Sequence, residues 1–132
     1  MILTSALACS ITVYRESRGT YLSEQILVAK VIRNRAMEQN ITLVDTIYRP
    51  GQFNALNGFK KHARFNNYKE LLSYYRIDDM ESLAMADRAC EFSKQSDAKY
   101  TYFTDKSIPV PSWAKKMHKV TTKHFNFYEV KQ

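Results

Sequence analysis

The sequence predicts a mainly helical α+β domain spanning residues 1–132, with a small antiparallel β element near the C-terminus. Three observations predict this fold. The chain has 132 residues, the usual size of a single domain. Apolar residues recur at helical spacing through most of residues 2–94. Residues 99–104 and 120–130 are instead rich in Thr, Phe and Tyr, which favour strands.

The first predicted helix covers residues 2–17 and carries two apolar stripes. One stripe consists of Leu3, Leu7, Ile11 and Tyr14. The other consists of Ile2, Ala6, Cys9 and Val13, and its next members are Glu16 and Ser17. Gly19 then supplies the C-terminal stop that helices commonly use.

The second predicted helix follows directly, with Thr20 as its cap and Glu24 and Gln25 in its first turn. Residues 26–32 are apolar nearly all round, so this helix should be the buried central one. Further helices are predicted at 43–48, 68–75 and 79–94, with a long irregular loop at 52–67. The two Thr- and aromatic-rich segments are expected to form a strand pair.

The chain is basic, with 20 Lys and Arg against 13 Asp and Glu. The basic residues concentrate in two regions, one from Arg49 to Tyr68 and one from Lys106 to the end. This pattern indicates a polyanionic partner, either an anionic wall polymer or nucleic acid, or else solvated lysines that only keep the protein soluble. No specific nucleic-acid motif and no membrane-spanning run is present in the sequence.

The cysteines and the N-terminus predict a protein with reduced thiols that is made without a secretory signal. Cys9 and Cys90 both fall in helical patterns, so reduced, buried thiols are expected. The segment before Cys9 contains no basic residue and is too short for a secretory signal. We therefore expect no signal peptide.

Glu16 is the strongest catalytic candidate. It continues an apolar stripe, so its carboxyl should lie at the edge of the core, and it falls in the last turn, where the helix dipole disfavours a negative charge. Both effects raise a carboxyl pKa and favour the protonated acid that a general acid needs. The alternative is a helix-end glutamate that is paired with Arg15 or Arg18.

Three segments resemble the SleB/CwlJ-type cell-wall hydrolase family. They are A-C-S-I-T-V-Y-R-E-S-R-G at 8–19, S-E-Q-I-L-V-A-K-V-I-R-N-R at 23–35 and I-Y-R-P-G-Q-F at 47–53. The resemblance implies a fold similar to goose-type lysozymes and lytic transglycosylases. It also implies cleavage of peptidoglycan between N-acetylmuramic acid and N-acetylglucosamine, with Glu16 as the catalytic acid and no cofactor.

The sequence departs from this family's pattern at two places. Thr20 stands where the family has a second glutamate. The stretch H-F-N-F-Y at 124–128 has one residue more than the family's His-x-Phe-Tyr, so either His124 is the family histidine followed by a bulge, or Phe125 takes that position.

Seven further residues are candidates for substrate binding, because polar side chains bind sugar hydroxyls and aromatic rings stack on sugar faces: Ser17, Arg18, Gln52, Phe53, Tyr102, Trp113 and His124. For each aromatic residue, core packing is the alternative. Asn34 and Arg35 are interpreted as a structural network. The histidines lack metal-ligand spacing, so no metal site is predicted.

The product is predicted from the scarcity of carboxylates near Glu16. Two other carboxylates could assist Glu16, but neither is well placed. Glu24 lies in the first turn of its helix, where stabilising the helix dipole is the better role for it, and Asp45 falls in a short predicted helix. A single carboxyl favours a lytic transglycosylase, which forms 1,6-anhydromuramyl ends without a second carboxylate.

The size and charge suggest a bacteriophage endolysin or a virion-associated enzyme, held in the host cytoplasm until lysis or carried in the virion, and acting on the wall in the periplasm. Other virion proteins are then potential partners. The rival interpretations are an inactive virion or wall-binding module of the same fold and, on charge alone, a nucleic-acid-binding domain.

Overall fold

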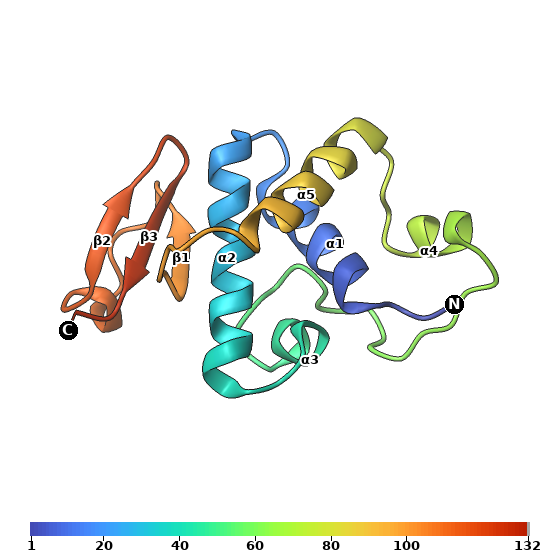
Figure 1. Ribbon diagram of the computed structural model, residues 1–132, viewed down its shortest axis with the longest axis horizontal. Helices are drawn as coiled ribbons and strands as arrows, with labels where there is room; N and C mark the ends of the chain where they lie inside the picture. The colour runs from blue at the N-terminus through green and yellow to red at the C-terminus, as the bar shows by residue number, and fades with distance from the viewer. Residues whose placement is uncertain (132) are drawn as a thin grey trace.

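The computed structural model describes residues 1–131, which form five α-helices, a short 3₁₀ helix and one three-stranded sheet (Figure 1). The helices are α1 (Ser5–Ser17), α2 (Leu22–Gln39), α3 (Leu43–Tyr48), α4 (Tyr68–Tyr74) and α5 (Met80–Ser93). The strands are β1 (Tyr102–Asp105), β2 (His118–Thr121) and β3 (Phe125–Glu129), and the 3₁₀ helix is Ser112–Ala114. The α+β fold, mainly helical with its sheet at the C-terminal end, is confirmed.

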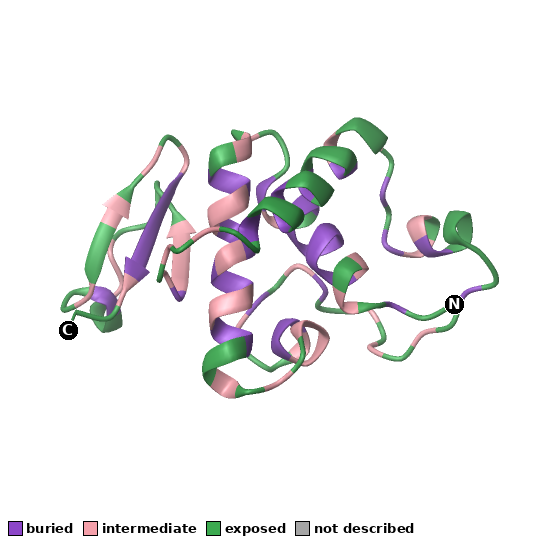
Figure 2. Cartoon of the chain, viewed as in Figure 1, coloured by how far each residue is buried: buried purple, intermediate pink, exposed green. Residues whose placement is uncertain are grey.

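The core forms where α1, α2 and α5 pack against one another. Val28, Ala29, Val31 and Ile32 of α2 have no exposed surface, which confirms this helix as the buried central one. From α5, Leu83, Ala86, Ala89 and Cys90 point inward, as the apolar spacing predicts. Figure 2 shows buried residues on all three helices and along β3. Within residues 1–131, no helix is long and apolar enough to cross a membrane.

The turn between α1 and α2 differs in detail from the prediction. Tyr21, not Thr20, is the N-cap of α2, and the Glu24 carboxylate accepts a hydrogen bond from the Tyr21 N–H at 3.2 Å. The Thr20 hydroxyl instead donates to the Ser17 carbonyl at 2.7 Å. Gly19 has a φ of +86°, a left-handed conformation that glycine adopts without strain, so it ends α1 as expected.

The N-terminus of α1 is shorter than predicted. The helix begins at Ser5, and the Thr4 hydroxyl caps it by accepting from the Leu7 N–H at 3.3 Å. Ile2 instead pairs with Arg64 in an isolated β-bridge. The N-terminal segment therefore anchors part of the irregular 52–67 loop.

The β element contains three strands, so the expected strand pair is incomplete. β3 lies in the centre and pairs antiparallel with β1 and with β2. The predicted 120–130 strand is interrupted at Thr122, whose N–H donates to the Phe125 carbonyl at 2.8 Å and closes a turn. β1 also contacts α2, which places one face of the sheet toward the helices.

The expectation of reduced thiols is wrong. Cys9 of α1 and Cys90 of α5 form a disulfide, and both residues are buried. Helical spacing alone does not show that α1 and α5 place both cysteines at the same point of contact.

Candidate active site

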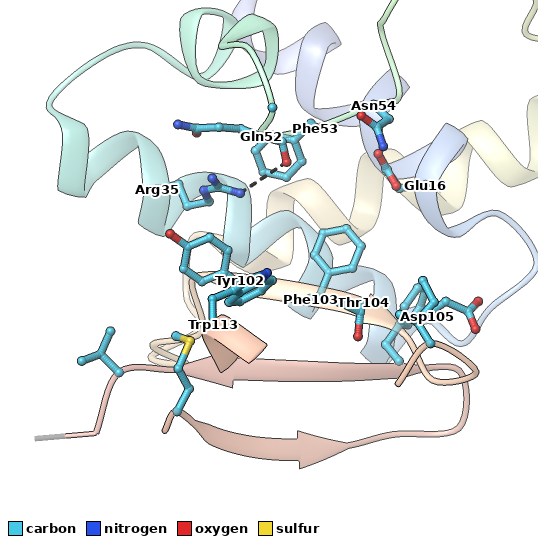
Figure 3. A pocket seen from close by; sticks show the side chains of 15 residues that line it. Glu16, Arg35, Gln52, Phe53, Asn54, Tyr102, Phe103, Thr104, Asp105 and Trp113 are labelled. Carbon is cyan, nitrogen blue, oxygen red and sulfur yellow. Dashed lines mark hydrogen bonds between the residues drawn. The ribbon is translucent and has the colours of Figure 1, made fainter. Parts of the chain in front are cut away.

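A cleft of about 910 Å³ opens between the sheet and the helical part of the molecule, beside the place where the two pack together (Figure 3). The end of α1 and the loop after α3 form one wall, and β1 forms much of the other. The lining residues combine one buried cation, two carboxyl groups, aromatic rings and polar side chains: Glu16, Arg35, Gly51, Gln52, Phe53, Asn54, Tyr102, Phe103, Thr104, Asp105, Ile108, Trp113, Met117, Phe125 and Val130.

Glu16 lies in the wall of this cleft, near Asn54 (Figure 3). Burial of the carboxyl raises its pKa above the ordinary value. The backbone of Ala55 and Asn54 and the charge of Arg15 act in the opposite direction without cancelling the effect of burial. The raised pKa favours a protonated carboxyl that faces an open site, as a general acid requires.

Arg15 holds the loop wall against α1. Its Nε donates to the Ala55 carbonyl at 2.7 Å, and its Nη1 donates to the Tyr75 carbonyl at 3.1 Å. The guanidinium also lies 4.9 Å from the centre of the Phe59 ring. Arg15 therefore positions the backbone beside Glu16 and forms no ion pair with it among the described residues.

Aromatic rings gather in the part of the cleft away from Glu16 (Figure 3). The ring centres of Tyr102 and Trp113 are 4.9 Å apart, and those of Trp113 and Tyr128 are 5.9 Å apart. Trp113 is 54% exposed although it is a large aromatic residue, so it does not serve core packing alone. Tyr102 and Trp113 are thus brought together at the cleft, where aromatic faces are available to a ligand.

Gln52 and Phe53 also line the cleft, with different surroundings. Phe53 is 5% exposed and belongs to the hydrophobic core, so its edge in the cleft is small. The side-chain oxygen of Gln52 accepts from Gln39 Nε2 at 3.0 Å. The carbonyl of Gln52 accepts a long 3.4 Å hydrogen bond from Arg35.

Asp105 is a second carboxyl in the cleft, and sequence reasoning missed it. Its Oδ1 accepts from the Ser107 N–H at 2.9 Å and from the Ser107 hydroxyl at 2.6 Å, and these bonds lower its pKa. Asp105 is therefore ionised at neutral pH while burial favours a protonated Glu16. Asp105 is distant from Glu16 in the sequence and reaches the cleft only because the fold brings β1 there.

A comparison with protein families identifies the chain. A family model described as Cell Wall Hydrolase matches residues 19–128. The chain belongs to the cell wall hydrolase family. It is accordingly a peptidoglycan-degrading enzyme. Comparisons with curated proteins and with solved structures give no match, so the likeness to goose-type lysozymes stays a prediction. The matched region begins at Gly19, so the role of Glu16 rests on its geometry and on the resemblance of the first segment.

Two predicted site residues of this cell wall hydrolase do not line the cleft. Ser17 is buried, and its hydroxyl donates to the Val13 carbonyl at 2.7 Å. Arg18 donates to Tyr14 and, at 3.1 Å, to Asp78. Arg18 thus holds the loop before α5, and a substrate contact for either residue stays a prediction.

His124 of the hydrolase also lies outside the cleft lining, in the turn before β3. Its ring Nδ1 is 2.7 Å from Glu24 Oε1, and its backbone N–H donates to Glu24 Oε2 at 2.8 Å. The Thr122 hydroxyl donates to the same carboxylate at 2.6 Å. Glu24 thereby connects α2 to the turn between β2 and β3 through hydrogen bonds, and His124 takes part in this structural contact.

Both basic regions of the cell wall hydrolase contribute residues to the cleft, but no lysine is among the residues that line it. Lys60, Lys61 and Arg64 are not among its lining residues. Lys61 pairs with Asp45 at 2.5 Å, which also assigns Asp45 a structural contact. Within residues 1–131, no group of three His, Cys, Asp or Glu side chains is arranged to hold a metal ion.

Proposed function

We propose that this protein cleaves the glycan strand of peptidoglycan between N-acetylmuramic acid and N-acetylglucosamine, with Glu16 as the general acid. One observation carries the proposal: a carboxyl with a raised pKa lines an open cleft that also presents Tyr102 and Trp113. A neutral carboxyl can donate to the glycosidic oxygen, and aromatic faces can hold the flanking sugars.

We further propose that the reaction is that of a lytic transglycosylase. Glu16 donates its proton to the leaving oxygen as the bond to the muramyl C1 breaks. The Glu16 carboxylate then removes the proton from the muramyl 6-hydroxyl, whose oxygen bonds to C1 and closes the 1,6-anhydro ring. No water is consumed, Glu16 ends protonated again, and the tethered hydroxyl has a high effective concentration.

Asp105 favours a second candidate, a muramidase-type hydrolysis. It is an ionised carboxylate in the same cleft, and glycosidases use such a group as a nucleophile or as a base for water. We prefer the transglycosylase because Asp105 is exposed and its Oδ1 is already occupied by two hydrogen bonds from Ser107.

Product analysis distinguishes the two reactions. Mass spectrometry of digested sacculi should show 1,6-anhydromuramyl ends, and Asp105→Asn should leave that product unchanged. Reducing muramic acid ends, lost together with activity in Asp105→Asn, would establish hydrolysis. A folded protein that binds sacculi without cleaving them would instead be an inactive wall-binding module.

We propose that the enzyme acts at the wall after release from a host cell, as a phage lysis protein or a virion-carried enzyme would. The disulfide between Cys9 and Cys90 supports this setting, because disulfides persist in oxidising compartments and not in the cytosol. Thiol titration of protein prepared under reducing conditions and then exposed to air should show that two thiols disappear, with Cys9 and Cys90 recovered in one disulfide-linked peptide.

A further inference from the structure

Arg35 is a buried cation that lines the cleft. It lies near the end of α2, is 8% exposed and faces the space between the loop and β1 (Figure 3). Its one protein hydrogen bond in the described chain is the long bond to the Gln52 carbonyl. No carboxylate of residues 1–131 lies within ion-pair distance of it.

Two aromatic rings hold the guanidinium in place. Its central carbon lies 4.6 Å from the centre of the Tyr102 ring and 5.0 Å from that of Phe53. Such contacts fix the plane of the guanidinium but leave its N–H groups unpaired. Because a guanidinium has five N–H donors, most of the donors of Arg35 have no protein acceptor.

The free N–H groups of Arg35 open into the cleft, and burial of the rest of the side chain leaves its charge poorly solvated, so a ligand of opposite charge would stabilise it. Arginine binds a carboxylate through two parallel hydrogen bonds, a geometry that a fixed guanidinium plane favours. In peptidoglycan, a muramyl residue carries a free lactyl carboxylate where the stem peptide is absent and peptide carboxylates where it is attached, whereas N-acetylglucosamine is neutral. The ligand that fits Arg35 is therefore a carboxylate on the muramyl side of the strand.

We propose that Arg35 forms a carboxylate-binding subsite that selects muramyl residues and orients the strand in the cleft. This inference rests on the proposed function. Tyr102 and Asp105 are the two ends of β1, which spans roughly 10 Å at about 3.3 Å per residue. Figure 3 shows Arg35 beside Tyr102 and Glu16 toward the Asp105 end. A carboxylate on Arg35 would thus fix which glycosidic bond reaches Glu16.

The alternative is that Arg35 only packs between its two rings. A packing residue would not distinguish an anionic strand from a neutral one. The test is therefore discrimination between ligands, which a purely structural role would not change.

The experiment measures binding by titration calorimetry in the Glu16→Gln background, so that no strand is cleaved. The ligands are solubilised strands with intact stem peptides, the same strands with all carboxyls converted to methylamides, strands stripped of peptide by an amidase, and neutral chitooligosaccharides. Arg35→Gln removes the charge, and Arg35→Lys keeps it without the planar donors. Arg33→Gln is the matched control, since Arg33 lies on the same helix but bonds to Ser93 and Cys90.

The anionic strands should bind about 10- to 100-fold more tightly than the methylamides and the chitooligosaccharides. Arg35→Gln should abolish this preference for anionic strands, Arg35→Lys should reduce it, and Arg33→Gln should leave it unchanged. Tighter binding of the amidase-stripped strands assigns the lactyl carboxylate, and tighter binding of the intact strands assigns the peptide.

Equal binding of anionic and neutral strands would overturn the subsite and leave the proposed function standing. Binding of no strand at all would overturn both. If Arg35→Gln fails to fold, two measurements still decide whether Arg35 binds a carboxylate. They are the preference for anionic over neutral strands in the Glu16→Gln protein and the reduction of that preference by Arg35→Lys.

Discussion

Glu16 and Glu24 lie on the two sides of one turn, and the pKa values of their carboxyls are shifted in opposite directions. Glu16 is in the last turn of α1 and Glu24 in the first turn of α2. Burial raises the pKa of Glu16. Burial alone would also raise the pKa of Glu24, but hydrogen bonds from Thr122, His124 and Tyr21 lower it to about 2.

The difference follows from the ends of helices. The first turn of a helix presents free N–H groups and a positive potential, whereas the last turn presents carbonyls and a negative one. Glu24 therefore accepts from the N-cap residue of its own helix and from the turn between β2 and β3, while Glu16 finds few donors. Burial decides the direction of a pKa shift only where donors are scarce. The same residue type thus becomes a reactive acid at one helix end and a structural anion at the other.

The largest effect should come from Glu16→Gln. This change removes the acidic proton and keeps the shape, so clearance of sacculi should fall by a factor of about 10² to 10⁴. Turbidity measures the rate, and circular dichroism checks the fold. Glu38→Gln, at an exposed position on α2, is the matched control. A folded Glu16→Gln protein that keeps more than about a tenth of the rate would remove Glu16 from catalysis.

A second prediction tests what holds Glu16 in place. The Cys9–Cys90 disulfide joins α1 to α5 across a separation of 81 residues. Its reduction should lower the free energy of unfolding by about 4 kcal/mol, because the unfolded chain gains freedom. Chemical denaturation with and without a reductant measures this. The Cys9→Ser/Cys90→Ser variant should be insensitive to reductant, and an equally insensitive oxidised wild-type protein would contradict the prediction.

Glu24→Gln should affect stability and leave the chemistry intact. Glutamine cannot carry the negative charge that these donors favour, so the free energy of unfolding should fall by roughly 3 kcal/mol at pH 7. Thermal and urea unfolding measure the loss. Below the unfolding temperature, the folded variant should retain 1,6-anhydro product formation. Loss of catalysis with unchanged stability would mean that Glu24, not Glu16, is the reactive carboxyl.

The helical half of the fold is predictable because its signals are local. An apolar period marks α2 and α5, and Gly19 marks the end of α1. The break between β2 and β3 has no such signal, because residues 121–125 contain no Gly, Pro or Asn. That turn is held by Glu24, which is distant in sequence and contributes its carboxylate from α2.

The site residues also divide into those with a local signal and those without one. Glu16 is predictable from its own helix, because its place on the apolar stripe and its place in the last turn both raise the pKa of its carboxyl. Arg35 and Asp105 become neighbours of the same cleft only when α2 and β1 come together. The spacing of Arg35 on its helix is equally consistent with a structural role, and the sequence does not show that it lacks a carboxylate. The disulfide escaped prediction for the same reason, because no local pattern states which helix faces meet.

The smallest and most specific effect is the pH dependence of stability, where the two glutamates should have opposite signs. The folded pKa of Glu24 is about 2 against an ordinary value of 4.5. Its contribution is therefore fully present above about pH 4.5 and is lost as the pH falls toward 2. The folded pKa of Glu16 is raised, so its contribution is present below the ordinary value of 4.5 and is lost as the pH rises through the raised pKa.

Urea denaturation of three proteins between about pH 3 and pH 8 separates the two contributions. Relative to wild type, Glu24→Gln should be less stable at neutral pH, and the gap should narrow as the solution is acidified. Glu16→Gln should behave in the opposite way and gain stability relative to wild type as the pH rises, because glutamine never has to ionise in a buried place. If the difference between Glu16→Gln and wild type did not change with pH, Glu16 would be an ordinary solvated carboxylate, and if it changed in the same direction as that of Glu24→Gln, the pKa of Glu16 would be lowered. Either result would remove the physical basis for its assignment as the general acid.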